Sequence, residues 1–151
     1  MREPILVIGV GAEGPASLSP AIQKEIDQAG HLWGGKRLLA HWPDHPAQKV
    51  IIGANIADLV PRLRQRGETR VVILASGDPG FYGIAATLLR YLPPDQLKIM
   101  PHVSALQLAF ARAGLAWNEA VFSSAHARPR SGRATPTLRA ISLMRVMARG
   151  R

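Results

Sequence analysis

The sequence contains no cysteine among its 151 residues. It therefore has no disulfide framework, no thiolate nucleophile and no cysteine-ligated zinc or iron–sulfur site. Long apolar runs are also absent, because the longest, Ile5 to Ala12, is far shorter than the roughly 20 residues that a membrane-spanning helix needs. Glu3 and Pro4 argue against a signal peptide. We expect a cytoplasmic protein that makes no contact with a membrane.

Acidic residues are missing from the last part of the chain. Residues 1–126 hold 12 Lys and Arg and all 10 Asp and Glu, whereas residues 127–151 hold seven Arg, no Lys and no acid. The net charge of +9 thus divides into +2 for the first segment and +7 for the second. Such a break in composition predicts a folded domain over 1–126 and an arginine-rich tail over 127–151, disordered or partly helical.

Within 1–126, short β-rich runs alternate with segments whose apolar residues recur at helical spacing. This alternation is typical of an α/β protein with an open, mostly parallel sheet flanked by helices. Ile5–Ile8 and Val71–Leu74 are apolar throughout, as central strands covered on both faces should be. Weaker strand candidates are residues 31–33, 50–52, 97–99 and 120–122.

Four segments carry the signals of helices. Ser19 and Pro20 are good residues for an N-cap and a first helical position, ahead of an apolar stripe that continues to Ala29. Apolar residues at i, i+3, i+4 and i+7 predict a helix from residue 56 to Gly67. The same spacing predicts helices over 84–92 and 106–113, the second with Ser104 as its N-cap.

Three turns follow predicted strands, which is where ligands bind in open parallel sheets, and we expect them to converge. The first, Gly9-Val-Gly11-Ala-Glu-Gly14, matches G-x-G-x-x-G. A dinucleotide site is disfavoured, because Pro15 and Pro20 delay the helix and because Gly34-Gly35-Lys36-Arg37 stands where the ribose hydroxyls need an acid. A purely structural turn remains an alternative.

The second turn, Ala75–Gly83, is the most informative stretch of the chain. Gly77 and Gly80 would let the backbone wrap around a ligand, and Asp78 could accept hydrogen bonds from backbone amides or from ligand hydroxyl or amine groups. The alternative is a tight turn in which Asp78 caps the helix that starts near Gly83.

The third turn, Pro101–Ala105, opens the last predicted helix. An N-cap at Ser104 would by itself explain its composition. Elsewhere, His41 and His45 are spaced like metal ligands on a helix, but Pro43 and Pro46 prevent that helix and no third ligand is evident. We therefore expect no metal, and a solvated loop at this segment.

The loops VIGVGAEGP, ASGDPGFYG and PHVSALQLAFARAG, together with WGGKRLL and SSAHARP, resemble the tetrapyrrole (corrin and porphyrin) methyltransferases from about Ile5 to Pro129. The likeness is strongest to members that methylate C5 of the corrin ring. It implies S-adenosylmethionine as cofactor, in a cleft between this domain and a second one, and a precorrin or cobalt-precorrin substrate of cobalamin biosynthesis. A second copy of the chain or a C15-methyltransferase/decarboxylase domain would be the partner.

The resemblance also assigns site residues, although it assigns no catalytic one. Direct displacement at a methyl group asks little of acids and bases, since alignment alone can supply roughly 7–11 kcal/mol. The implied cofactor-binding residues are Gly11, Ala12, Gly77, Asp78, Gly80, Phe81, Tyr82, Ser104 and Ala105. The implied substrate-binding residues are Gly9, Lys36, Arg37, His126 and Arg128.

The sequence departs from the family pattern at three places near the implied cleft. Ala12-Glu13 follows Gly11 in place of Pro-Gly, His102 replaces a glycine, and Ala127 replaces another. After Pro129 the resemblance ends, so we expect a first domain without its second, with reduced or no activity alone, from a shortened gene or a shifted reading frame. The alternative is a non-catalytic α/β domain whose basic arm binds nucleic acid.

Overall fold

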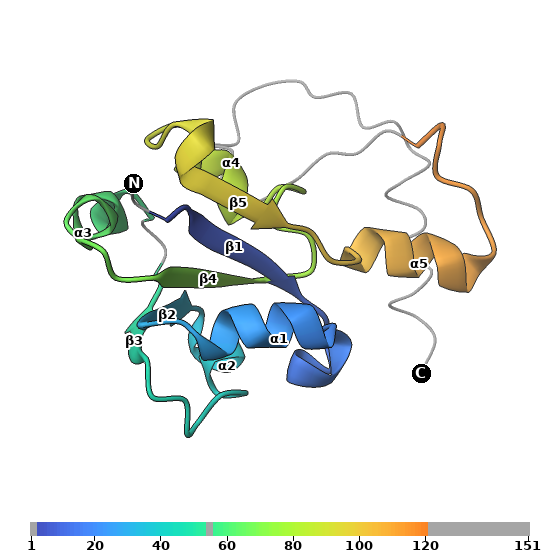
Figure 1. Ribbon diagram of the computed structural model, residues 1–151. Helices are drawn as coiled ribbons and strands as arrows, with labels where there is room; N and C mark the ends of the chain where they lie inside the picture. The colour runs from blue at the N-terminus through green and yellow to red at the C-terminus, as the bar shows by residue number, and fades with distance from the viewer. Residues whose placement is uncertain (1–2, 54–55, 121–151) are drawn as a thin grey trace. The chain divides into compact units, whose positions relative to one another are not determined.

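The computed structural model describes residues 3–53 and 56–120. Five parallel strands form one sheet in the order β3-β2-β4-β1-β5, with β1 between β4 and β5 (Figure 1). This confirms the predicted α/β fold with an open parallel sheet. The strands are β1 (Ile5–Val10), β2 (His31–Gly34), β3 (Gln48–Ile51), β4 (Val71–Ser76) and β5 (Leu97–Met100).

Helices connect these strands, and the chain divides into two compact units, of which the first ends at Leu108 and the second begins at Ala109. The α-helices are α1 (Pro20–Asp27), α2 (Lys36–Leu39), α3 (Val60–Arg64), α4 (Ile84–Leu88) and α5 (Ala105–Ala113). Short 3₁₀ helices are η1 (Gly14–Ser17), η2 (Ile56–Leu59) and η3 (Pro94–Gln96).

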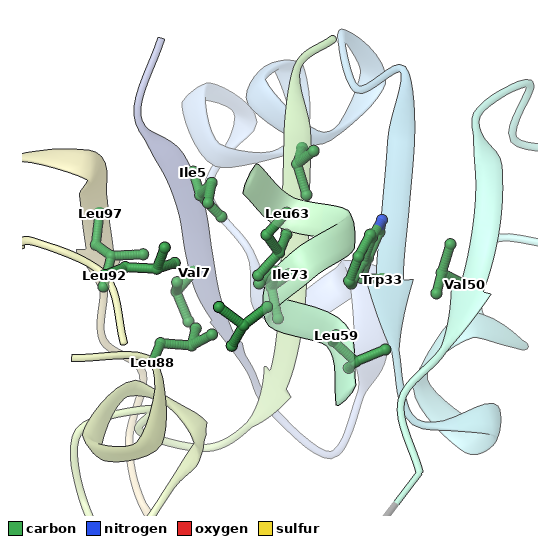
Figure 2. Close-up of a cluster of buried hydrophobic side chains, with 12 residues drawn as sticks. Ile5, Val7, Trp33, Val50, Leu59, Leu63, Ile73, Leu88, Leu92 and Leu97 are labelled. Carbon is green, nitrogen blue, oxygen red and sulfur yellow. The ribbon is translucent and has the colours of Figure 1, made fainter. Parts of the chain in front are cut away.

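The two central strands are buried on both faces, as their unbroken apolar runs predict. In register, Val7 pairs with Ile73 and Ile8 with Leu74, so each pair points to one face of the sheet. The face of Val7 and Ile73 packs against α3 and α4, and Figure 2 shows Leu63 of α3 against this cluster. The opposite face packs against α1 and α2. Two apolar layers therefore hold β1 and β4 in place.

The order of the strands fixes where a ligand can bind. From β1 the chain passes through α1 to β2 on one side of the sheet, whereas from β4 it passes through α4 to β5 on the other side. Because α1 and α4 cover opposite faces, the chain after β1 and the chain after β4 continue toward opposite faces of the sheet. Such a switch in direction opens a crevice at the carboxyl ends of two neighbouring strands.

The prediction of one helix from residue 56 to Gly67 is wrong. The segment is η2 followed by the short α3, because Pro61 has no N–H to donate and is tolerated only in the first turn of an α-helix. The apolar spacing was still informative, since Leu59, Val60 and Leu63 are all buried.

The helix predicted over 84–92 ends at Leu88 and continues to Leu92 as turns. The helices that begin at Pro20 and after Ser104 are confirmed. The strand predicted at 120–122 lies almost wholly outside the described residues, and the domain boundary at 126 stays a prediction. In the part of the chain that the structure describes, no helix is long and apolar enough to cross a membrane.

Candidate functional site

Three loops meet at the carboxyl edge of the sheet. We call them the β1 loop (Gly11–Ser17), the β4 loop (Gly77–Gly83) and the β5 loop (Pro101–Ser104). The N–H of Gly77 donates to the carbonyl of Val10 over 2.8 Å, which joins the first two. A Cβ atom built on Gly9 would lie 2.7 Å from the backbone nitrogen of His102 and would also collide with the carbonyl oxygen of Gly77. The predicted convergence of the three bends is therefore confirmed.

Backbone approaches backbone closely at this edge, and glycine makes the approach possible. Gly77 has a φ of +65°, a conformation that other residues rarely adopt. A Cβ on it would lie 3.4 Å from Ser104 Cα and from the carbonyl oxygen of Val103. The β4 loop is thus set directly against the β5 loop.

The β4 loop is folded by its own hydrogen bonds. Asp78 Oδ1 accepts from the N–H of Gly80 over 2.8 Å, which is an Asx turn, and the carbonyl of Pro79 accepts from Ala85 of α4 over 3.1 Å. Helix α4 begins after Gly83 without a side-chain cap. The alternative in which Asp78 caps this helix is therefore wrong: its half-buried carboxylate shapes the turn instead.

The β4 loop carries two aromatic side chains just before its last residue. Phe81 and Tyr82 contact each other edge to face, with 4.9 Å between ring centroids. Tyr82 has a φ of 51°, and it is the only non-glycine residue with a positive φ among the residues that the structure describes. Its side chain belongs to a residue that is 55% exposed. A left-handed backbone at a tyrosine is strained, and strain of this kind persists where the surrounding structure imposes it.

Ser104 is the N-cap of α5, as predicted. Its Oγ accepts from the N–H of Gln107 over 3.2 Å, and Gln107 Oε1 accepts from the N–H of Ser104 over 2.8 Å. This reciprocal pair is a capping box, which the pattern Ser-x-x-Gln could have revealed from the sequence. The hydroxyl and the backbone N–H of Ser104 are both engaged in this cap, so a role of Ser104 and Ala105 in cofactor binding stays a prediction.

A shallow, open cleft of about 490 Å³ lies between the β4 and β5 loops. Its lining residues are Asp78, Pro101, His102, Val103 and Gln107. Of the residues predicted to bind cofactor, Asp78 lines it directly, and Gly77 and Ser104 lie immediately beside it. His102 was expected near the cleft as a departure from the family pattern, whereas the position of Gln107 in the lining was not predicted. A hollow of about 610 Å³ in the second unit is lined by Ala116, Trp117, Asn118 and Ala120, none of which titrates.

The predicted substrate-binding residues divide into three groups. Gly9 lies beneath the cleft, where Gly77 and His102 cover it. Lys36 and Arg37 are exposed at the start of α2, which follows β2 at the same edge of the sheet but does not line the cleft. His126 and Arg128 lie outside the described residues, so their role stays a prediction.

The histidine pair in the loop after α2 has structural contacts. His45 Nε2 lies 3.0 Å from the carbonyl of Ile26, and its Nδ1 accepts from the N–H of Ala47 over 3.1 Å. Both ring nitrogens of His45 are thus engaged with backbone, so the solvated loop predicted there is in fact anchored by this ring. In residues 3–53 and 56–120, no three His, Asp or Glu side chains form a group that could hold a metal ion.

Loops that meet at the carboxyl edge of a parallel sheet, where the strand order changes direction between β1 and β4, are typical of a doubly wound α/β ligand-binding domain. The sequence matches a family model described as Tetrapyrrole (Corrin/Porphyrin) Methylases over residues 4–149. The chain belongs to this family. The match extends past Pro129, where we expected the resemblance to end, into the arginine-rich segment.

Curated relatives share more than a third of the aligned residues with this chain. The cobalt-precorrin-7 C(5)-methyltransferase of Salmonella typhimurium is 38% identical over 124 residues, which are 82% of this chain and 62% of that protein. The precorrin-6Y C(5,15)-methyltransferase (decarboxylating) of Mycobacterium tuberculosis is 38% identical over 115 residues, which are 76% of this chain and 29% of that protein. The chain thus spans less than two thirds of the length of each of these relatives.

Solved structures share the fold. The precorrin-6Y methylase of Archaeoglobus fulgidus superposes with a TM-score of 0.62 at 22% identity, covering 75% of this chain and 59% of that one. The uroporphyrin-III C-methyltransferase of Thermus thermophilus, crystallised with S-adenosylhomocysteine, superposes with a TM-score of 0.58 at 23% identity. It covers 72% of this chain and 51% of that one.

Proposed function

We propose that the chain is the cofactor-binding domain of an S-adenosylmethionine-dependent methyltransferase that acts on C5 of a precorrin or cobalt-precorrin in cobalamin biosynthesis. The observation that carries this proposal is that the β1, β4 and β5 loops meet at one edge of the sheet, beside an open cleft lined by Asp78 and the β5 loop. The names of relatives at 38% identity supply the substrate class and the ring position. They give no support to the alternative of a nucleic-acid-binding arm.

The residues of the cleft suit an adenosyl cofactor. Gly77 lets the β4 loop pack directly against the β5 loop, which brings Asp78 to the wall of the cleft. Asp78 supplies a carboxylate that can accept hydrogen bonds from ribose hydroxyls or from the amino group of the methionine part. Phe81 and Tyr82 add aromatic surface at the end of the same loop. The proposed cofactor set therefore contains both the polar and the apolar groups that such a ligand needs.

When bound, S-adenosylmethionine would supply a sulfonium methyl group that an electron-rich ring carbon can attack, with S-adenosylhomocysteine as the leaving group. The protein's contribution is to hold two reactants in line, which can lower the barrier by roughly 7–11 kcal/mol. Lys36 and Arg37 are exposed cations at the same edge and would pair with the carboxylates of the substrate. No acid or base of the cleft has to move a proton for this displacement.

The proposal extends to partners and place. A second domain, a second copy of the chain, or a C15-methyltransferase/decarboxylase domain would supply the opposite wall of the substrate site. A cytoplasmic location belongs to the same proposal. The proposed partners and location both presuppose that the chain is part of a methyltransferase, so cofactor binding is the property to measure first.

Titration calorimetry of the full chain with S-adenosylmethionine tests the proposed function. We expect saturable binding that Asp78→Ala weakens at least about tenfold, since a hydrogen bond to a charged group contributes about 1.5–3 kcal/mol. Asp95→Ala is the matched control: Asp95 is exposed in η3, which precedes β5 at the amino end of the sheet. Absence of binding by the unmodified chain, or equal weakening by the two substitutions, would contradict the proposal.

A further inference from the structure

His102 occupies the space that two glycines of β1 and its loop leave open. A Cβ on Gly9 would lie 2.8 Å from His102 Cβ, and a Cβ on Gly11 would lie 2.8 Å from His102 Cε1. The ring is therefore seated over the end of β1, with its residue half-buried and part of the cleft wall. His102 is the second residue after β5, the strand that pairs with β1 on the side opposite to β4.

The ring is fixed there by one hydrogen bond to the β1 loop. His102 Nε2 lies 3.1 Å from the carbonyl oxygen of Ser17. A carbonyl can only accept, so Nε2 carries the proton and donates it. The buried Nδ1 has no partner within the described residues, so this bond is the ring's polar attachment. One donor atom thus ties the β5 loop to the β1 loop.

The residue that accepts this bond also organises the β1 loop. Ser17 Oγ accepts from the N–H of Gly11 over 2.9 Å and donates to the carbonyl of Gly14 over 2.7 Å. The conformation of the β1 loop therefore depends on Ser17, and the position of Ser17 relative to the cleft depends on His102. A residue buried for packing alone would contact the apolar layers, whereas His102 lines the cleft and is hydrogen-bonded to the β1 loop.

We propose that His102 is a positioning residue, whose Nε2–H holds the β1 loop at the distance from the β5 loop that cofactor binding requires. This inference rests on the proposed function, because it assigns the cleft to an adenosyl ligand. The residue acts through Ser17 and the loop and does not take part in the displacement itself. A side chain that keeps a donor at the position of Nε2 should therefore preserve binding, and one that loses it should not.

Two amide substitutions test this requirement in the full chain. In His102→Gln the side-chain nitrogen reaches the position of Nε2, whereas in His102→Asn it reaches only that of Nδ1. With S-adenosylhomocysteine as the probe in calorimetry, we expect His102→Gln to bind within about threefold of the unmodified chain and His102→Asn at least about tenfold more weakly. Amide hydrogen exchange of residues 9–17 without ligand should be faster in His102→Asn than in His102→Gln.

The outcomes separate this inference from the proposed function. Equal affinity of both variants and of the unmodified chain would overturn the positioning role and leave the proposed function intact. Failure of the unmodified chain to bind the probe would overturn both. Thermal unfolding verifies that each variant is folded. If His102→Asn is not, His102→Ala takes its place, and equal affinity of His102→Ala and His102→Gln would be the result that overturns the inference.

Discussion

The β1 loop and the β4 loop lie side by side at the cleft but hold their shapes by different means. Besides its internal bonds through Ser17, the β1 loop depends on side chains from distant parts of the sequence: His102 donates to the carbonyl of Ser17, and the ring of His41 packs against Gly14, where a Cβ would lie 2.5 Å from His41 Nδ1. The β4 loop contains bonds within itself, as between Asp78 and the N–H of Gly80.

This difference separates two kinds of sensitivity. A loop fixed by long-range contacts loses its shape when any of those contacts is removed, so substitutions there should lower the free energy of unfolding. A loop fixed by its own turn can be altered at lower cost, and substitutions there should act mainly on ligand binding. Substitutions at three positions, each with a control elsewhere in the chain, test this comparison by their effect on the free energy of unfolding.

Gly9→Ala should have the largest effect, because Gly9 lies in β1 against both the β4 loop and the β5 loop. Its Cβ would collide with the carbonyl of Gly77 and lie 2.7 Å from the backbone nitrogen of His102, and neither backbone can rotate away. We expect a loss of about 3 kcal/mol in the free energy of unfolding, measured by urea denaturation.

Gly53→Ala is the matched control for this substitution. No atom of the residues that the structure describes lies within 4 Å of a Cβ built at Gly53, so the same chemical change should meet little resistance. Its effect should stay within about 0.5 kcal/mol, as for most surface substitutions. Similar losses from both alanines would show that the junction at Gly9 is not tightly packed.

Ser17→Ala should have an intermediate effect. It removes the acceptor of the Gly11 N–H and the donor to the Gly14 carbonyl, both partly buried. Leaving these groups without partners should cost about 2 kcal/mol in the same measurement. Ser76→Ala, at an exposed serine that ends β4, should cost less than about 0.5 kcal/mol. A negligible loss from Ser17→Ala would mean that the β1 loop holds its shape without this hydroxyl.

Substitution of the strained Tyr82 should give the smallest difference in the free energy of unfolding. The difference should favour glycine over alanine, which is the reverse of the usual order. With the ring removed in both variants, Tyr82→Gly should be more stable than Tyr82→Ala by about 1 kcal/mol, since the left-handed conformation costs a non-glycine residue that much. At the exposed Ala86 inside α4 the order should be reversed, so that Ala86→Gly is less stable than the unmodified chain by about 1 kcal/mol. Urea denaturation of these variants and of the unmodified chain measures both differences, and a preference for alanine at both positions would argue against strain at Tyr82.

Local signals in the sequence predicted the fold better than the site. Unbroken apolar runs located β1 and β4, and Ser19 with Pro20 located the start of α1, because burial on both faces and helix capping each depend on a few adjacent residues. Where one local signal opposed another, the prediction failed: the helical spacing after residue 56 outweighed Pro61, although a proline cannot donate the bond that a longer helix requires there.

For the site, the turn-forming residues were predictable and their contacts were not. Gly77 and Asp78 follow a strand and so had to lie at its carboxyl end, where a parallel sheet binds ligands. The pairing of His102 with Ser17 spans 85 positions in the sequence, and nothing near either residue indicates the other. Even the outcome for Asp78, an Asx turn and not a helix cap, depended on where Gly83 places the start of α4.

The sequence by itself determined the strands, most of the helix starts and the family to which the chain belongs, because each depends on residue types at short spacing. Tertiary structure alone decided which atoms of the three converging turns contact each other and that a histidine after β5 fixes a loop after β1. The physical reason is the strand order: parallel pairing of β1 with both β4 and β5 brings their ends together, and that pairing is set by the packing of two apolar layers across the whole sheet.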